Sequence, residues 1–336
     1  MQKKVKMEDI AKKLQVSTVT VSKALNDKEG VSNDLKTQIK SMALKMGYTL
    51  HTAAPTTTGN IGIIVAERFS SREEDPMLSF YVRFFQTITF RLSRLGYYGL
   101  FESISYEDER NGVPPRLLQE KRIDGLIVLG QLQSSYLQKL IDTQIPLVFL
   151  DFYDENFEVD SVITDNFYSS YDLTNYLIHK GHTKVAFLGD IYATSSIQDR
   201  FCGYYKSLLA HRIPYRADYI ISDRTEDGKI YSEFPLPADP PTAFVCSSDE
   251  TAYILIRYLQ GLGYNIPEDF SVVGFDSDSY ALLSNPHITT VEVNMTEMAK
   301  RAAELILSKI KSHRKALGKI LVKTRMIEQD SVRSLL

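Results

Sequence analysis

Apolar residues recur at helical spacing in three short segments at the start of the chain. The first two segments, residues 7–14 and 18–26, are separated by only three residues, which is room for one tight turn. Ser17 directly precedes the second segment and Ser32 precedes the third, where a serine hydroxyl can cap a helix. We therefore predict three small helices around one core, with Gly47 ending the third. The expected core positions are Met7, Ile10, Ala11, Leu14, Val21, Ala24, Leu25, Leu35, Ile39, Met42, Ala43 and Met46.

The second of these helices exposes a face that suits contact with DNA. Its outward residues carry short hydroxyls, one amide and one cation but no carboxylate, and such groups bond to phosphates and base edges. The outward residues are Thr18, Val19, Thr20, Ser22, Lys23 and Asn26. Two helices joined by so tight a turn are typical of a helix-turn-helix. The alternative is a small helical bundle with a solvated basic face.

Beyond residue 60 the pattern changes to short apolar runs that alternate with helical segments. Continuous apolar strands separated by helices are typical of parallel sheets that are covered on both faces. The predicted strands are 60–67, 97–103, 124–130, 146–152, 161–166, 184–190, 218–223, 242–248 and 270–276. Because these strands are too many for one modest sheet, we predict an α/β body with two doubly wound parallel-sheet subdomains.

The predicted organisation is a small all-α head, a linker and this two-part body. The linker has a threonine run and one proline, and the chain is expected to pass between the subdomains near residues 154–160. A helix at 296–312, with the strands after it, should return to the first subdomain. The predicted domains are 1–48 for the head, 49–59 for the linker and 60–336 for the body, in which 60–160 and 290–336 form the first subdomain and 161–289 the second.

Charge and cysteine content add to this picture. Residues 1–48 contain ten lysines against five acidic residues, a net charge of about +5, whereas the whole chain carries −3. Cys202 and Cys246 are the only cysteines, and without clustered histidines we expect no disulfide, no metal site and no cofactor. Since no long apolar stretch and no signal segment stand out, we expect a soluble, cytoplasmic protein without a membrane partner.

Polar residues follow four of the predicted strands: Asp151, Asp165, Ser248 and Asp276. Each alone is most simply a turn or helix-capping residue. Ligands of open parallel sheets, however, bind beyond the carboxyl ends of the strands, and two facing sheets make a cleft there. The recurrence of carboxylates at these ends favours a neutral polyhydroxylated ligand, of which a sugar is the simplest example.

The ordered succession of motifs resembles the lactose-repressor/galactose-repressor (LacI/GalR) family of transcription regulators, from about Val5 to about Ile310. The segments that carry the resemblance are MEDIAKKLQVSTVTVSKALN, VITDN, KGHTKVAFLGD, DRFCGYYKSLL, PTAFVCSSDETA, IPEDFSVVGFD and NPHITTV. The resemblance implies a body of the periplasmic-binding-protein type I fold that binds a small effector between its subdomains. It also implies a homodimer that places two heads on a symmetric operator.

The resemblance also implies roles for single residues. Thr18, Val19 and Lys23 match the base-contacting positions of the family, which more often has arginine in place of this lysine. The residues that match its DNA backbone contacts are Ser17, Thr20, Ser22 and Asn26. The residues that match its effector contacts are Phe80, Tyr81, Asp151, Asp165, Ser196, Arg200, Ser248 and Asp276. Ser248 departs from the usual asparagine, and the alternative for Arg200 is an ion pair with Asp199.

The linker departs most from the family. Its members usually form a hinge helix that wedges leucines into the minor groove of DNA. Here Pro55 stands in the middle of the matching stretch and disfavours helix at Ala54, while Thr57 stands where the leucine is expected. We therefore expect the hinge helix to be broken or absent.

The sequence as a whole predicts a repressor of a carbohydrate-utilisation operon that responds to a sugar-like effector. It leaves open the identity of the effector and the sequence of the operator. It also leaves open whether the effector induces or co-represses, whether a partner protein takes part in the control, and whether the chain forms a dimer or a tetramer. A sugar-processing enzyme is the weaker alternative, because no phosphate-binding glycine loop and no nucleophile with a base is evident; His179 and His182 suggest capping or solvated residues. The predicted DNA-binding head and the lack of an evident signal segment argue against a further alternative, an extracytoplasmic sugar-binding protein with the same body fold.

Overall fold

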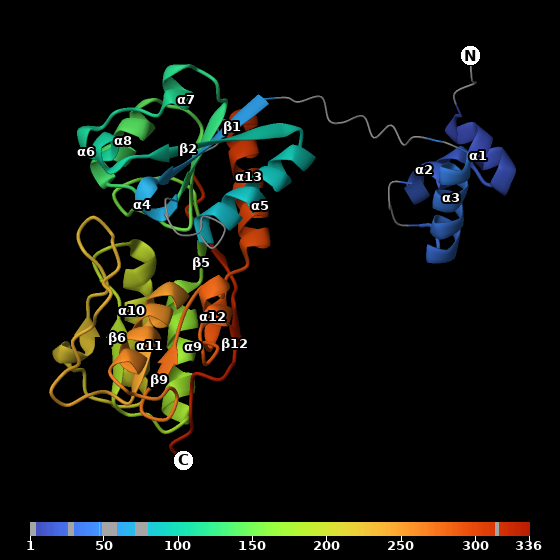
Figure 1. The fold of residues 1–336 in the computed structure, drawn as a ribbon. Coiled ribbons are helices and arrows are strands. Elements are labelled where there is room, and N and C mark those ends of the chain that lie inside the picture. Colours follow the sequence, from blue (N-terminus) through green and yellow to red (C-terminus); the bar gives the residue numbers. More distant parts are fainter. Residues whose placement is uncertain (1–4, 26–29, 47, 49–58, 71–79, 313–315) are drawn as a thin grey trace. The chain divides into compact units, whose positions relative to one another are not determined.

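The computed structural model describes residues 5–25, 30–46, 48, 59–70, 80–312 and 316–336 (Figure 1). The chain divides into two compact units, Met1–Thr57 and Thr58–Leu336, which we call the head and the body. Asn26, Gly47 and the linker with Pro55 lie outside the described residues, so the predictions that concern them remain predictions.

The head contains the three predicted helices. Ser17 Oγ accepts the backbone N–H of Thr20 at 3.0 Å, and Ser32 Oγ accepts that of Leu35 at 3.4 Å, so both serines cap their helices. Gln15 adopts a left-handed backbone (φ 54°) and closes the turn between the first two helices. The bounds are α1 Met7–Leu14, α2 Thr18–Leu25 and α3 Asn33–Lys45. The fully or nearly fully buried core residues are Ile10, Ala11, Val21, Ala24, Leu25, Ile39 and Ala43.

The first lobe of the body is built on a six-stranded parallel sheet with the order β11-β5-β4-β3-β1-β2. Helices cover both faces, because the strand residues alternate between two apolar cores. The strands are β1 Gly59–Ala66, β2 Tyr97–Ile104, β3 Gly125–Leu129, β4 Leu147–Leu150, β5 Ser161–Thr164 and β11 Lys319–Val322. The helices are α4 Glu67–Ser70, α5 Phe80–Arg94, α6 Tyr106–Asn111, α7 Arg116–Gln119, α8 Ser134–Asp142 and α13 Met295–Ser312.

Helices α5 and α13 lie side by side on one face of this sheet (Figure 1). Phe84, Ile88 and Leu92 of α5 are fully buried there against strand residues such as Ile63 and Ile127. Helix α8 covers the opposite face and packs on Phe149. The apolar face of α5 formed by these three residues therefore belongs to the core of the first lobe.

The second lobe has a four-stranded parallel sheet with the order β7-β6-β8-β9. Its helices also cover both faces, with α9 and α10 on one side and α11 on the other. The elements are β6 Val185–Leu188, β7 Ile220–Ile221, β8 Ala243–Cys246, β9 Ser271–Val273, α9 Asn166–His179, α10 Ser195–Ala210, α11 Asp249–Gly261, α12 Ser279–Leu283 and the short 3-10 helix η2 Ala217–Tyr219. Every predicted strand therefore forms, and both sheets are doubly wound.

The chain passes between the lobes at other points than the sequence suggested. β5 lies in the first lobe and not in the second, because Ser161 begins a register with β11 as well as pairing with β4. The buried carboxylate of Asp160 accepts the backbone N–H groups of Leu317 and Gly318 and so fixes the start of that pairing. The first crossing therefore follows β5, not residues 154–160.

The C-terminal segment also divides differently from the expectation. β11 returns to the first lobe as predicted, but β12 (Arg325–Ile327) pairs with β10 (Thr290–Glu292). The last residues pack on the second lobe, where Val272 N–H donates to the Ser331 carbonyl. His182, interpreted from sequence as a capping or solvated residue, is buried and bonds to the Thr242 hydroxyl at 2.9 Å and to the Arg333 carbonyl at 3.2 Å.

Candidate functional site

The outward face of α2 presents described residues that the sequence assigned to DNA contacts. Thr18 and Lys23 are exposed, and the apolar side chain of Val19 is 63% exposed. Ser17 and Thr20 share a hydroxyl hydrogen bond of 2.8 Å. The apolar side chain of Val19 is suited to contact a thymine methyl, while the neighbouring hydroxyls and the cation are suited to bond to polar base edges.

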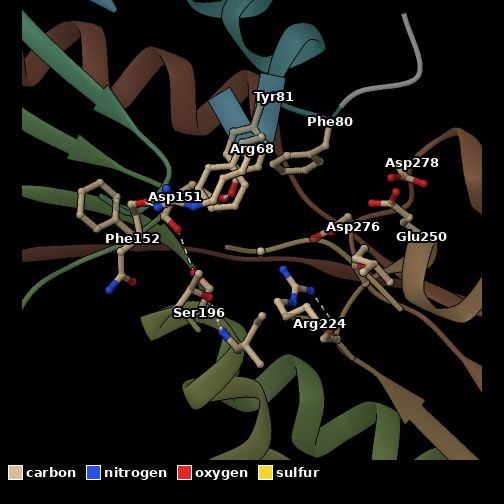
Figure 2. A pocket seen from close by; sticks show the side chains of 18 of the residues that line it. Arg68, Phe80, Tyr81, Asp151, Phe152, Ser196, Arg224, Glu250, Asp276 and Asp278 are labelled. Atoms are coloured by element: carbon tan, nitrogen blue, oxygen red, sulfur yellow. Dashed lines mark hydrogen bonds between the residues drawn. The ribbon is translucent and has the colours of Figure 1, made fainter. Parts of the chain in front are cut away.

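The body encloses a cavity of about 320 Å³ at the carboxyl ends of β3 and β4 in one lobe and β8 and β9 in the other (Figure 2). We call it the inner cavity. The residues after these strands reach it from both lobes, as expected for open parallel sheets. The sequence-predicted residues that line it are Phe80, Tyr81, Asp151, Ser196, Arg200, Ser248 and Asp276.

Asp165 is the predicted residue that does not line this cavity. Its carboxylate accepts the backbone N–H of Tyr168 at 3.2 Å and caps α9. The next residue, Asn166, instead points inward and bonds to Arg200. Ser248 lines the cavity but also caps α11, with its Oγ 3.2 Å from the backbone nitrogen of Thr251.

Arg200 is the best-anchored charge of the inner cavity. Its Nε donates to Asn166 Oδ1 at 2.8 Å, Nη1 donates to the Ser247 carbonyl, and Nη2 donates to Asp276 Oδ1 at 3.1 Å. The guanidinium carbon also lies 3.7 Å from the centre of the Phe275 ring. The ion pair with Asp199 is therefore not formed; that carboxylate accepts the hydroxyl of Tyr153 at 2.9 Å.

Asp151 is buried and carries a polar atom that is directed at no protein group. Its Oδ2 accepts the Tyr81 hydroxyl at 3.1 Å, while Oδ1 has no hydrogen-bond partner among the described residues. Burial first, and then the charge of Asp276, raise the pKa of Asp151 to about 7. Both aspartates hold a positive φ, 70° and 104°, a backbone strain that functional sites often contain. The second carboxylate oxygen is therefore a buried acceptor without a donor.

The cavity wall also contains residues that the sequence did not predict, among them Arg68, Gln131 and Arg224. Arg224 pairs with Asp223 through Nε and Nη2 at 2.8 and 2.7 Å, directly after β7. The same strand-end rule that selected Asp151 would have found this pair.

Arg68 left no such signal in the sequence. It bonds to Glu109, which is fully buried in α6, and at 2.8 Å to the Gln131 carbonyl. No local pattern shows that these three segments meet.

The three guanidiniums of the inner cavity are paired with carboxylates, and its wall also carries Lys229, Glu250 and Asp278. The guanidiniums of Arg68, Arg200 and Arg224 each face a buried or nearly buried carboxylate. Asp151 is the lining carboxylate that carries an unsatisfied oxygen. Such a wall favours a ligand that donates hydroxyl groups over one that brings a negative charge. Within the described ranges, no group of three or more His, Cys, Asp or Glu side chains could hold a metal ion.

Hydrogen bonds join the two lobes along one wall of the cavity. Gln131 Oε1 accepts the backbone N–H of Ser195 at 2.7 Å, and the Ser196 hydroxyl donates to the Asp151 carbonyl at 2.8 Å. Tyr153 N–H donates to Ser195 Oγ at 3.2 Å. A ligand that contacts both lobes would stabilise this closed arrangement.

The chain is similar to two described families. Residues 6–50 match the bacterial regulatory proteins of the lacI family, and residues 174–332 match a periplasmic binding protein-like domain. The HTH-type transcriptional repressor PurR of Vibrio cholerae serotype O1 (strain M66-2) is 29% identical, over 98% of each chain. The probable HTH-type transcriptional repressor ExuR of Bacillus subtilis (strain 168) is 28% identical, over 98% of this chain and 99% of its own.

Solved structures share the fold. A complex of the transcriptional regulator CelR with cellobiose has a TM-score of 0.69 at 21% identity and covers 98% of this chain and 100% of its own. The lac repressor dimer bound to operator has a TM-score of 0.62 at 19% identity, covering 99% and 100%. These similarities confirm the predicted fold class. None of the described helices is long and apolar enough to cross a lipid bilayer.

We expect Asp151→Asn to stabilise the body in a pH-dependent way. A carboxyl group whose pKa is about 7 in the fold and about 4 in the unfolded chain costs nothing below pH 4. The cost grows from pH 4 to pH 7 and is complete above pH 7, where removing the charge should gain roughly 1–3 kcal/mol. Thermal unfolding at pH 8 and pH 4 measures this difference.

The control for this measurement is Asp330→Asn. Asp330 is exposed, and its side chain has no hydrogen bond within the described part of the chain. The control should unfold like the parent at both values of pH. Equal or lower stability of Asp151→Asn at pH 8 would contradict the burial of a charged carboxylate.

Proposed function

We propose that the chain is a member of the LacI/GalR family of bacterial regulatory proteins and a repressor that binds operator DNA through its head and a sugar-like effector in its body. One observation carries this proposal. The same polypeptide combines an exposed helix-turn-helix face with a partly open polar cavity whose two walls belong to different lobes. Such a combination fits ligand-controlled DNA binding better than catalysis, and the curated relatives described above are repressors.

We propose that α2 lies in the major groove of the operator. Thr18 and Lys23 then bond to base edges, and Val19 contacts a thymine methyl. The residues proposed to contact the DNA backbone are Ser17, Thr20, Ser22 and Asn26. A lysine makes a less rigid contact to guanine than an arginine, so Thr18 and Val19 carry more of the specificity.

We propose that the chain acts as a homodimer, in the cytoplasm where the chromosome lies. The similar lac repressor was solved as a dimer bound to operator. In the first lobe, the edge strand β2 and helix α5 expose large apolar side chains; Phe90 is 65% and Tyr98 60% exposed. Such a surface suits contact with a second copy. The proposed domains are the head at 1–48, the linker at 49–59 and the body at 60–336.

The proposed effector is a neutral carbohydrate. One of its hydroxyls donates to Oδ1 of Asp151, the oxygen without a hydrogen-bond partner. Other hydroxyls bond to residues of the second lobe, namely Ser196, Arg200, Ser248 and Asp276. The apolar face of a sugar ring packs on Phe80 or Tyr81. CelR, which shares the fold, was solved with cellobiose. Induction and co-repression differ only in which state of the dimer the effector stabilises.

Lys23→Ala should weaken operator binding by about 1–3 kcal/mol, since it removes a base-edge contact. The operator is first selected from a random duplex library with the full chain, and affinities for it and for a scrambled duplex are measured by gel shift. The ratio of the two affinities should fall for Lys23→Ala. Lys45→Ala, which removes an exposed lysine of α3, should leave the ratio unchanged. An unchanged ratio for Lys23→Ala rules out the base contact.

A carbohydrate effector should change operator affinity. A thermal-shift screen of neutral sugars should find one that raises the melting temperature by several degrees, and this sugar should alter operator affinity at least tenfold, about 1.4 kcal/mol of coupling. Its sign distinguishes induction from co-repression. Asp151→Asn should bind the same operator but lose most of the response. A bound sugar that leaves operator affinity unchanged would contradict the regulatory role.

A further inference from the structure

A second cavity of about 340 Å³ adjoins the inner cavity, and we call it the outer cavity. The two share six lining residues, so they adjoin one another, and we call the shared residues the neck. The shared residues are Arg68, Phe69, Gln131, Thr194, Arg224 and Gly228. The first three come from the first lobe and the others from the second, so the neck between the cavities is built by both lobes.

The neck is narrow because of one close approach across the lobes. Gly228 lies in a tight loop of the second lobe, closed by the hydrogen bond from Gly228 N–H to the Thr225 carbonyl. A Cβ on Gly228 would stand 2.9 Å from Arg68 Cδ, and its φ of 89° also favours glycine. Arg68 is held from the other side by Glu109. The close approach of Arg68 and Gly228 therefore separates the inner cavity from the outer cavity.

The outer cavity presents two aromatic rings that nothing in the protein uses. Tyr106 begins α6 in the first lobe and is 46% exposed, and Tyr192 lies in the second lobe and is 87% exposed. Neither ring makes a ring contact or a hydroxyl hydrogen bond with any described residue. The backbone N–H of Tyr192 donates to Asp190 Oδ1 at 2.9 Å, which fixes the turn that carries its ring. Exposed aromatic rings at a cavity mouth are suited to the apolar face of a sugar ring.

The outer cavity carries two carboxylates besides its amides and hydroxyls. Asp190, Glu226 and the side chain of Gln133 line it. Its two guanidiniums, Arg68 and Arg224, are already paired with Glu109 and Asp223. This wall can accept hydrogen bonds from ligand hydroxyls, and it disfavours an anionic ligand group such as a phosphate.

We propose that the effector is a neutral oligosaccharide of at least two rings, with its second ring bound in the outer cavity against Tyr192 and Tyr106. This inference rests on the proposed function, since it assigns the first ring to the inner cavity. The linkage between the rings passes the neck beside Arg68 and Gly228. A disaccharide then contacts both lobes at two places, whereas a monosaccharide contacts them only at the inner one.

Calorimetric titration of the full chain tests the proposal. The probes are glucose, galactose, mannose, xylose and arabinose, with disaccharides and trisaccharides built from them. At least one disaccharide should bind ten or more times tighter than each of its constituent monosaccharides. Tyr192→Ala should reduce that advantage at least fivefold and keep monosaccharide affinity within twofold. Tyr168→Ala, a control that removes a 54% exposed tyrosine lining neither cavity, should change neither affinity.

The outcomes separate this inference from the proposed function. A monosaccharide that binds as tightly as its disaccharides overturns the outer site but supports a sugar effector. A disaccharide advantage that survives in Tyr192→Ala also overturns the outer site. If no sugar of any length binds, the effector class itself is wrong, and the inference is overturned with it.

Discussion

The buried guanidinium of Arg200 is the interaction on which the effector cavity depends. It joins the start of α9, the end of β8 and the end of β9, so three segments far apart in sequence share one charge centre. In a medium of low dielectric constant such a cation persists only with full compensation, and Asp276 and the Phe275 ring supply much of it. Removing one partner would leave a buried charge, so these positions constrain one another.

Asp151 contrasts with that arrangement. Burial raises the pKa of its carboxyl group, and Oδ1 lacks a donor, so among the described residues that line the inner cavity Asp151 is the one with an unsatisfied buried oxygen. An unsatisfied buried acceptor costs stability in the free protein, and a ligand hydroxyl relieves that cost. Part of the affinity for an effector therefore arises from the fold itself. The same reasoning explains why a strained backbone is tolerated at this strand end.

The sequence predicted those features that depend on local pattern. Amphipathic periodicity identified α1, α2 and α3, and apolar runs identified the strands, because a parallel strand covered on both faces must be apolar. Strand-end polarity and the family resemblance together predicted seven of the 21 residues that line the inner cavity. Sheet membership was harder, since β5 is assigned to the first lobe by pairing with β11, which lies far along the chain. The sequence could not predict that Arg68 lines the cavity for the same reason, because its position depends on Glu109 in another helix.

The covalent connection to the head enters the body at the first lobe. β1 is the first strand of that lobe and the point at which the linker enters the body. Hydrogen bonds from Ser195 and Ser196 to the first lobe hold the cleft closed along one wall. A ligand shifts the balance between open and closed lobes only by its difference in affinity for them. Groups that touch one lobe alone contribute affinity without control. Under the proposed function, regulation therefore comes from ligand contacts that span both lobes, which we place at Asp151 with Asp276 and at the neck formed by Arg68 and Gly228.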